Sequence, residues 1–216
     1  QRGTVQALQQ RWEPVPVARP AEDPAGGAPA PPAAPVPAEQ DPATAPVAPE
    51  PGSGEAFAVV HVPRFGDAAV IGAAQGVGLG EVLNDGVLGH YPGTAMPGAV
   101  GNAAFAGHRT TYGRPLARID ELEPGDPLVV EQGDAWYVYR VTGASVVAPE
   151  QVEVIAPVPG DPGAEPSRRL ITLTACHPEY SARQRYVVHG ELESWQPRSA
   201  GVPAALAGSA PAPAAG

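Results

Sequence analysis

The sequence contains no lysine, because all 13 of its basic residues are arginine. A chain without lysine has no side-chain amine for a Schiff base or an isopeptide bond, which argues against a pilin-like role as the cross-linked protein. The arginines stand against 23 acidic residues, giving a net charge of −10, and no basic stripe runs along the chain. Capture of a phosphate backbone needs such a stripe, so nucleic acid is not an expected partner.

Cysteine and long apolar segments are equally scarce. The single cysteine, Cys176, cannot form an internal disulfide, so cysteine usage leaves the compartment open. No run of 18 or more strongly apolar residues predicts a membrane span. His177 beside Cys176 lacks further ligands at tetrahedral spacing, and residues 72–78 lack the order of a phosphate-binding loop. We therefore expect no metal and no cofactor.

Proline and glycine, by contrast, are abundant: 29 and 26 of 216 residues. Thirteen of the prolines lie between Pro14 and Pro51, which predicts a disordered Pro/Ala-rich arm. Residues 196–216 are predicted to be a disordered low-complexity tail. The remaining residues, 56–195, number about 140, a common size for one domain.

Residues 1–12 place Val5, Leu8 and Trp12 at near-helical spacing but lack the apolar centre of a signal peptide. A stiff Pro/Ala arm after such a segment suits a membrane-anchored ectodomain, so we expect residues 1–55 to be a juxtamembrane segment and linker behind an anchor upstream of residue 1. A cytosolic start followed by an arm without a spacing role fits the same composition.

The central residues are predicted to be mostly β, because short β-branched and aromatic runs alternate with Gly, Pro and Asp. The expected strands are 57–62, 68–72, 102–106, 128–132, 135–147, 169–175 and 185–193, with a hairpin turn at 131–134 and short helices at 79–83 and 116–122. The stretch 148–167 is too long for a passive connection and predicts a functional loop, with a helical turn near 151–155.

The phase of the strand before Cys176 carries a mechanistic inference. Alternation places Thr172, Thr174 and Cys176 on one face, with Cys176 at the strand exit. If the next strand pairs antiparallel, Arg185 lies opposite Cys176. A guanidinium beside a thiol favours the thiolate and can stabilise an anion formed next to it. A buried, unreactive thiol is the alternative reading.

A nucleophilic cysteine also needs a proton-transfer partner. The candidates are His61, His90, His108, His177 and His189. His108 closes a strand-like run and begins a polar loop, a position where catalytic groups often lie. His61 falls inside an apolar strand and His189 shares a face with Arg185, which favours structural or supporting roles for both.

Thr172-Leu173-Thr174-Ala175-Cys176, followed by Arg185 at the head of a valine-rich strand and preceded by Gly107-His108-Arg109, resembles the sortase family. The blocks that begin at Gly89, Ala106 and Cys176 are similar to class E sortases of actinobacteria. One position departs from the family signature, with Ala175 where threonine is usual, and its side chain is expected to face away from the cysteine. The resemblance covers residues 56–195.

The resemblance implies a mostly β fold, a closed eight-stranded barrel with a few short helices. It also implies a cysteine transpeptidase site made of Cys176, His108 and Arg185, with Arg183 a near alternative to the last. Tyr112 stands where class E enzymes carry the tyrosine linked to an LAxTG sorting signal, and Thr111, Ala175 and His90 are assigned to the substrate side. The loop 148–167 corresponds to the one that grips the signal.

The implied partners are the sorting-signal peptide of a secreted surface protein and an amine acceptor, either a cell-wall precursor or a pilin lysine. The implied place of action is the outer face of the cell membrane, with membrane contact only through the upstream anchor. Two other functions stay open: a non-catalytic barrel module that binds such peptides, and a hydrolytic cysteine peptidase.

Overall fold

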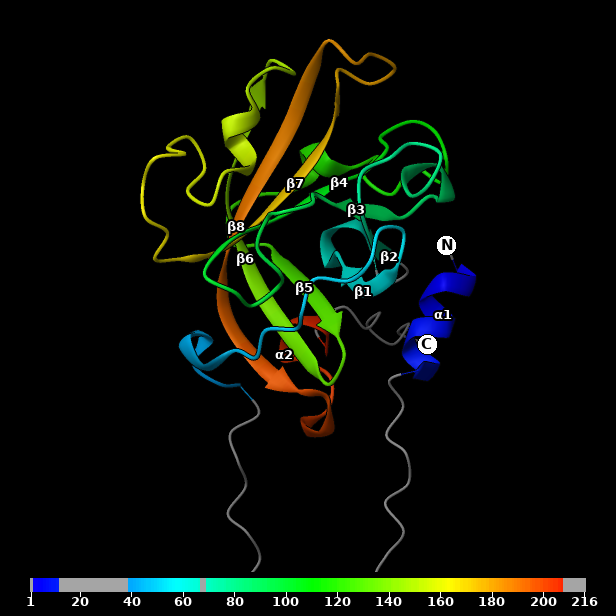
Figure 1. Ribbon diagram of the computed structural model, residues 1–216. Helices are drawn as coiled ribbons and strands as arrows, with labels where there is room; N and C mark the ends of the chain where they lie inside the picture. Colours follow the sequence, from blue (N-terminus) through cyan, green and yellow to red (C-terminus); the bar gives the residue numbers. More distant parts are fainter. Residues whose placement is uncertain (1, 12–38, 67–68, 208–216) are drawn as a thin grey trace, which may run out of the picture.

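The computed structural model describes residues 2–11, 39–66 and 69–207, and in these ranges eight strands close into one barrel (Figure 1). Their order around the barrel is β1-β2-β3-β4-β7-β8-β6-β5. The strands are β1 (Ala56–His61), β2 (Val70–Gln75), β3 (Leu88–His90), β4 (Gly101–Ala106), β5 (Pro127–Gln132), β6 (Ala135–Val147), β7 (Arg169–His177) and β8 (Gln184–Pro197). The expected closed eight-stranded barrel is confirmed.

Each strand expected from the sequence has a counterpart whose ends differ by a few residues, although Ala68, the expected start of one, lies outside the described residues. The strand β3 was missed, because three residues are too few to show an alternating pattern. The β5–β6 hairpin pairs Gln132 with Ala135 across the expected turn.

The expected helices of the barrel are shorter than predicted. In place of helices at 79–83 and 116–122 the chain forms 3-10 turns, η3 (Leu83–Asp85) and η4 (Ile119–Glu121). The helical turn expected near 151–155 is present as η5 (Val152–Ile155).

Two strand pairings are parallel, and one of them shapes the site. β2 pairs with β3 and β4 pairs with β7 in parallel, the latter from Gly101 with Arg169 to Ala106 with Thr174. Parallel strands point the same way, so β4 and β7 end at the same rim of the barrel. β8 starts at that rim, because it pairs antiparallel with β7.

The barrel interior is filled by apolar and aromatic side chains from all sides. Phe105, Tyr137 and Tyr139 are among its largest buried side chains. The Gly98 amide donates to the Tyr139 hydroxyl at 2.8 Å, which satisfies a polar atom in the core. Burial raises the pKa of Tyr137 to about 12.

Residues 39–55, here called the N-terminal strap, lie against the barrel, although the sequence assigned them to the arm. Gln40 forms a bridge with Trp195 of β8, and the Trp195 indole donates to the Thr44 hydroxyl at 3.0 Å. The Tyr137 hydroxyl donates to the Pro46 carbonyl oxygen at 2.9 Å. Proline-rich composition indicated disorder, but it does not report these contacts with distant strands.

Two helices pack on the outside of the barrel. α1 (Arg2–Arg11) buries Val5 and Leu8 against Val59 of β1, in keeping with their near-helical spacing, whereas Trp12 lies outside the described residues. α2 (Ala204–Ala207) packs near β5, where Leu206 contacts the cluster around Trp136. Among the described helices, none is long and apolar enough to cross a membrane.

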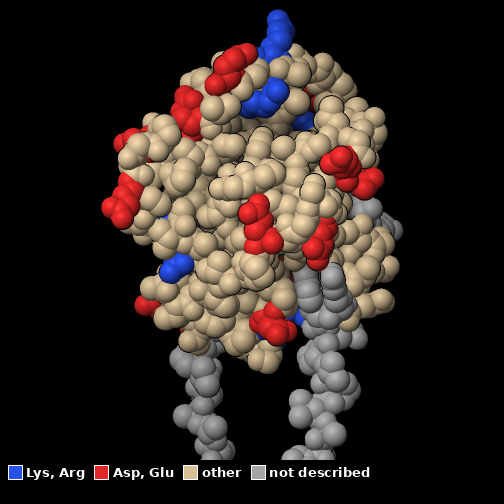
Figure 2. Space-filling model, in the orientation of Figure 1, with Lys and Arg blue, Asp and Glu red and all other residues tan. Residues whose placement is uncertain are grey.

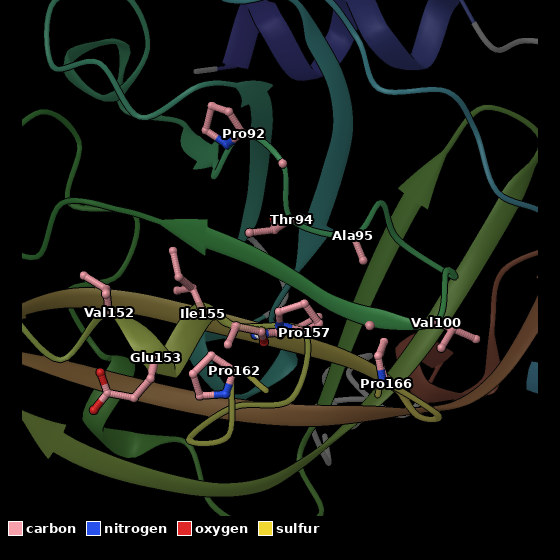
Figure 3. Close-up of a pocket in the computed structure, with 14 residues that line it drawn as sticks. Pro92, Thr94, Ala95, Val100, Val152, Glu153, Ile155, Pro157, Pro162 and Pro166 are labelled. Atoms are coloured by element: carbon pink, nitrogen blue, oxygen red, sulfur yellow. Dashed lines mark hydrogen bonds between the residues drawn. The ribbon is translucent and has the colours of Figure 1, made fainter. Parts of the chain in front are cut away.

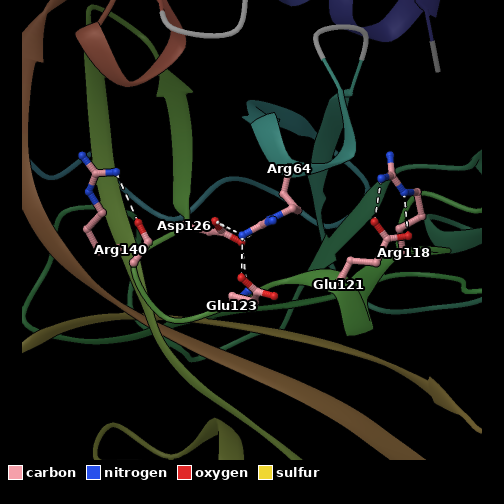
Figure 4. Close-up of polar contacts among 7 residues, drawn as sticks. Arg64, Arg118, Glu121, Glu123, Asp126 and Arg140 are labelled. Atoms are coloured by element: carbon pink, nitrogen blue, oxygen red, sulfur yellow. Dashed lines mark hydrogen bonds and ion pairs between the residues drawn. The ribbon is translucent and has the colours of Figure 1, made fainter.

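Arginine–carboxylate pairs tie together the loops at one part of the barrel surface (Figure 4). Arg64 binds both carboxylate oxygens of Asp126, at 2.7 and 2.8 Å, and also Glu123 at 3.0 Å. Arg118 pairs with Glu121 one helical turn away. The pairs of Arg64 with Glu123 and of Arg118 with Glu121 are solvent-exposed, so each contributes at most about 1 kcal/mol to stability, whereas Asp126 is only 15% exposed.

Candidate active site

His108 is placed by the end of β4. The last register pair of β4 and β7 joins Ala106 and Thr174, and the Gly107 amide continues the ladder by donating to the Thr174 carbonyl oxygen at 3.0 Å. Two residues beyond this pair on each parallel strand are His108 and Cys176. The pairing therefore brings His108 to the level of Cys176, on the same outward face.

The glycine before His108 is required by packing. A Cβ atom at Gly107 would lie 2.8 Å from side-chain carbons of both Leu88 and Leu116, closer than real contacts allow. The missing side chain lets the chain leave the strand tightly against the core. His108 is thus fixed to a rigid part of the barrel rather than to a loose loop.

Cys176 lies near the end of β7, directly opposite Arg185 of β8. Residues directly opposite each other in an antiparallel pair project from the same face. Along β7 the residues Ile171, Leu173 and Ala175 belong to the barrel core, whereas Leu170, Thr172, Thr174 and Cys176 occupy the alternate, outward positions. The alternation and the pairing predicted from the sequence are both confirmed.

Arg185 is partly exposed, and its Nη1 donates to the carbonyl oxygens of Ala182 and Gln184, both at 2.9 Å. Within the described residues the remaining guanidinium nitrogens have no hydrogen-bond partner. A guanidinium carries five N–H groups, so the side chain is held by its loop while N–H groups remain for an oxygen of a bound molecule.

The turn between β7 and β8 carries both basic and acidic side chains. Figure 2 shows acidic side chains scattered over one face, and at the top of the view basic side chains with acidic ones beside them, where the turn between β7 and β8 lies in Figure 1. Arg183 and Arg185 belong to that segment.

The His108 ring lies between an amide and an aromatic ring. Its Nε2 lies 3.1 Å from Oδ1 of Asn84, which is part of η3, and its ring centroid is 5.1 Å from that of Tyr112. Partial burial lowers the pKa of His108 below its ordinary value of 6.5. The imidazole is therefore mainly neutral at pH 7, with Nε2 donating to Asn84.

Tyr112 reaches His108 through a backbone conformation that is unusual for residues with side chains. Its φ is +50°, and the next two residues, Gly113 and Arg114, also have positive φ, at +77° and +48°. A Cβ atom on Gly86 would lie 2.7 Å from the Tyr112 carbonyl oxygen, so the turn after η3 also needs glycine to hold this loop. Strained non-glycine residues of this kind often occur at functional sites.

The structure separates the four residues assigned to the substrate side. Thr111 and Tyr112 are exposed on the loop after His108, at the rim. Ala175 is 3% exposed and its side chain belongs to the core, so the assignment of this side chain to substrate contact is wrong. His90 is 0% exposed, in contact with Phe105 within the barrel, and it is likewise not available for direct contact.

A second set of side chains lies on the inward face at the same rim. Arg109 is 5% exposed and its Nη1 donates to Nδ1 of His177 at 2.9 Å, while its Nη2 pairs with Asp120 at 2.5 Å. The guanidinium carbon lies 5.9 Å from the ring centroid of Tyr186. Each inward residue comes directly after an outward one in the sequence: Arg109 after His108, His177 after Cys176, and Tyr186 after Arg185.

A cleft of about 670 Å³ runs along the outward face of β4 (Figure 3). One wall is the loop after β3, with Pro92, Thr94 and Ala95, and the other is the loop between β6 and β7, with η5 and several prolines. Asn102 of β4 lies between them. The lining is mainly apolar, as expected for a site that binds an extended peptide or a small organic molecule.

Asn102 holds the second wall. Its Nδ2 donates to the carbonyl oxygens of Val154 at 3.4 Å and Ala156 at 3.1 Å. Its Oδ1 accepts from the Thr172 hydroxyl at 2.7 Å, and Thr172 in turn lies 2.8 Å from Nδ1 of His189. This chain orients the Asn102 amide, so the loop between β6 and β7 is fastened to the sheet at two carbonyl groups.

The sequence analysis missed Asn84, Arg109 and Asn102. Asn84 lies in a Gly- and Asp-flanked stretch that indicates only a turn, and Asn102 looks like any polar residue in a strand. Arg109 could have been found, since an arginine that follows a candidate histidine at a strand end carries a charge that needs a partner. Within the described ranges, no group of three or more His, Cys, Asp or Glu side chains is placed to hold a metal ion.

The site thus combines a cysteine, an imidazole and a guanidinium at the ends of neighbouring strands of a closed barrel. Comparison with known proteins identifies the family to which this arrangement belongs. The chain matches the family model described as "Sortase domain" over residues 60–193. It belongs to the sortase family.

Among individual relatives the likeness is to class E, as the sequence motifs indicated. The chain is 43% identical to sortase SrtE1 of Streptomyces coelicolor over 163 residues, covering 73% of this chain and 45% of the relative. It is 38% identical to sortase SrtE2 of the same organism over 142 residues, covering 62% of this chain and 54% of the relative. The chain thus spans about half the length of the curated relatives it matches.

Solved structures agree with this assignment. The SrtA sortase from Actinomyces oris superposes with a TM-score of 0.70 at 42% identity, covering 74% of this chain and 92% of that one. Sortase E1 from Streptomyces coelicolor, solved with a tripeptide in the active site, gives a TM-score of 0.66 at 42% identity and covers 71% and 97% of the two chains.

Proposed function

We propose that this protein is a cysteine transpeptidase that cleaves a sorting signal between threonine and glycine and transfers the acyl group to an amine. The observation that carries the proposal is the position of Cys176, directly opposite Arg185 and level with His108 at one rim of the barrel. Membership of the sortase family supports the same chemistry.

In the first half-reaction the Cys176 thiolate attacks the threonine carbonyl carbon and forms a C–S bond. The electron pair of the carbonyl moves to its oxygen, where N–H groups of Arg185 stabilise the negative charge. His108, in its protonated form, then donates a proton to the glycine nitrogen as the C–N bond breaks. The products are a thioacyl enzyme and a peptide with a free amino end.

In the second half-reaction an incoming amine attacks the thioacyl carbon, and His108 takes the proton that this nitrogen loses. The C–S bond breaks, which regenerates the thiolate and leaves a new amide. The sequence has no lysine, so its own side chains supply no acceptor amine. The acceptor is a cell-wall precursor or a lysine of another surface protein.

We place the signal in the cleft along β4, with its threonine at Cys176 and its leucine in the apolar part. Thr94 in the cleft wall contacts the backbone amide of Ala104. Ala104 precedes His108 by four residues, so the two positions are about 13 Å apart at the rise of a strand. The leucine of an extended four-residue signal lies about 10 Å from its threonine. The reach of the signal is thus comparable to the distance from this wall to the level of His108 and Cys176.

The preference we propose is LAxTG over LPxTG. Tyr112 is 53% exposed and lies over His108, where its ring can contact the residues beside the scissile bond. The proposed place of action is the cell surface, where sortases meet secreted proteins and wall precursors.

The test is to mix the protein with a Leu-Ala-x-Thr-Gly peptide, with and without triglycine, and to follow the products by mass spectrometry. We expect cleavage after threonine, an acyl adduct on Cys176, and a ligated product only with triglycine; Cys176→Ala should bind the peptide without cleaving it. A matched Leu-Pro-x-Thr-Gly peptide should react more slowly. Binding without cleavage in the wild type would instead identify a peptide-binding module, and cleavage without ligation a hydrolytic peptidase.

A further inference from the structure

The first wall of the cleft is connected to the N-terminal strap by a chain of hydrogen bonds through the protein interior. Nε2 of Gln75 donates to the Glu50 carboxylate at 2.5 Å, and Oε1 of Gln75 lies 2.7 Å from Nδ1 of His90. Gln75 is 4% exposed and His90 0% exposed. The chain thus begins at a surface carboxylate of the strap and passes through two buried side chains.

The carboxylate sets the direction of the first two hydrogen bonds in this chain. Because a carboxylate only accepts, Gln75 must turn its NH₂ group to Glu50 and its oxygen to His90. His90 therefore carries a proton on Nδ1. In the neutral ring Nε2 is then an acceptor, so of the two oxygens beside it, the Thr94 hydroxyl at 3.1 Å and the Ala95 carbonyl at 3.0 Å, only the Thr94 hydroxyl can donate to it. The far side of the ring thus lies against the loop after β3.

Thr94 and Ala95 are themselves cleft residues. The Thr94 hydroxyl also contacts the Tyr91 carbonyl oxygen at 2.7 Å and accepts from the Ala104 amide at 3.4 Å, so its position defines how the loop lies on β4. The Glu50 carboxylate touches the same loop a second time, accepting from the Gly93 amide at 3.3 Å.

We propose that Glu50 is a positioning residue for the peptide cleft, and that the N-terminal strap is through it a working part of the substrate site. Glu50 acts through Gln75 and His90 on the wall formed by Thr94 and Ala95, and it touches none of the reacting atoms. The inference rests on the proposed function in so far as the cleft holds the sorting signal. Under this proposal His90 supports the cleft wall from inside the barrel and does not contact the substrate itself.

The predicted consequence is a change in peptide affinity without a change in chemistry. Glu50→Ala should raise KM for the Leu-Ala-x-Thr-Gly peptide about threefold to tenfold, the range expected for one or two lost hydrogen bonds, with kcat within about twofold of the wild type. Glu50→Gln keeps an oxygen that can accept from Gln75 and should restore most of the affinity. A matched control is Asp41→Ala, which removes the cap of the 3-10 turn at the other end of the strap, far from the relay.

A second measurement reports the wall directly and needs no turnover. The amides of Thr94 and Ala95 donate to the carbonyl oxygens of Tyr91 and Asn102, not to Glu50. Residue-resolved hydrogen exchange at these two amides should be faster in Glu50→Ala than in the wild type and in Asp41→Ala. A general loosening of the strap would instead accelerate exchange in Asp41→Ala as well.

The outcomes separate the two proposals. Unchanged KM together with unchanged exchange at Thr94 and Ala95 in Glu50→Ala would overturn the positioning role, and so would equal effects of Asp41→Ala. If the wild type leaves the peptide intact, the proposed function fails, and the exchange measurement decides on the relay alone. Faster exchange with unchanged KM would show that the wall moves but does not bind the signal, which also overturns the inference.

Discussion

The two faces of the sheet at the rim of the barrel are built from neighbouring residues but differ in the contacts that their side chains make. The outward residues are His108, Cys176 and Arg185, which are partly exposed, and the inward residues are Arg109, His177 and Tyr186, which hold one another. Strand alternation explains the difference, because each strand end supplies one residue to each face. A reactive group on one side of the sheet is thus backed by a supporting group on the other.

The comparison predicts that outward substitutions change activity and leave stability almost unchanged. Arg185→Ala should lower kcat about 100-fold to 1,000-fold, since it removes donors to the developing oxyanion, with a thermal midpoint close to that of the wild type. The control is Arg183→Ala, an exposed arginine of the same turn whose side chain contacts only Ser181 among the described residues. Peptide turnover and thermal unfolding measure the two effects. An equal loss of kcat in both variants would mean that activity depends on the turn as a whole and not on the arginine directly opposite Cys176.

Inward substitutions should act mainly on stability. Asp120→Asn leaves the buried Arg109 guanidinium without its counter-charge, and we expect the free energy of unfolding to fall by about 1–3 kcal/mol. The value is below that of fully buried pairs because the Asp120 side chain is 45% exposed. Glu121→Gln breaks an exposed pair with Arg118 nearby and should change stability by less than about 1 kcal/mol. Denaturant titration of the three proteins provides the measurement; a smaller effect for Asp120→Asn than for Glu121→Gln would contradict the distinction.

The smallest effect concerns pH. Burial lowers the pKa of His90, His108 and His189 below 6.5. Below about pH 6.5 the unfolded chain therefore binds more protons than the folded one, so stability falls as the pH decreases and is fully present above pH 7. We expect the thermal midpoint to drop by a few degrees between pH 7.5 and 5.5.

His189→Gln should flatten that slope, because it removes one of the three groups. The carboxylates whose pKa values are lowered by arginine, such as Glu191, lose their contribution only below about pH 4.5, outside this window. A thermal midpoint that stays constant or rises from pH 7.5 to 5.5 would contradict the predicted loss of stability with decreasing pH.

Local sequence patterns predicted the features that depend on alternation and turns. The position of Cys176 opposite Arg185 follows from strand phase and an antiparallel pairing, and both are present. The parallel pairing of β4 with β7, which brings His108 level with Cys176, was not predicted; the family resemblance supplied only the choice of His108. Pairing between distant strands leaves no local signal that periodicity can detect.

The errors at His90 and Ala175 have a common cause. Both residues lie in blocks that resemble the family, and such a block contains core residues as well as contact residues. For Ala175 the alternation already placed the side chain inside the barrel. For His90 the strand β3 was too short to assign a face, so its burial could not be predicted. The strap was missed because its contacts with Trp195 and Tyr137 join residues far apart in the chain.

Closure of the barrel limits how a peptide can be recognised. Closure gives each of the eight described strands a neighbour on both sides, which limits the open rows of backbone amides and carbonyls to short stretches such as residues 143–147 of β6, where only β8 is paired. Recognition through a long backbone ladder, which tolerates many sequences, is therefore restricted in this fold. Under the proposed function, side chains and loops on the outside of the barrel carry most of the recognition, which suits a short motif with few fixed residues.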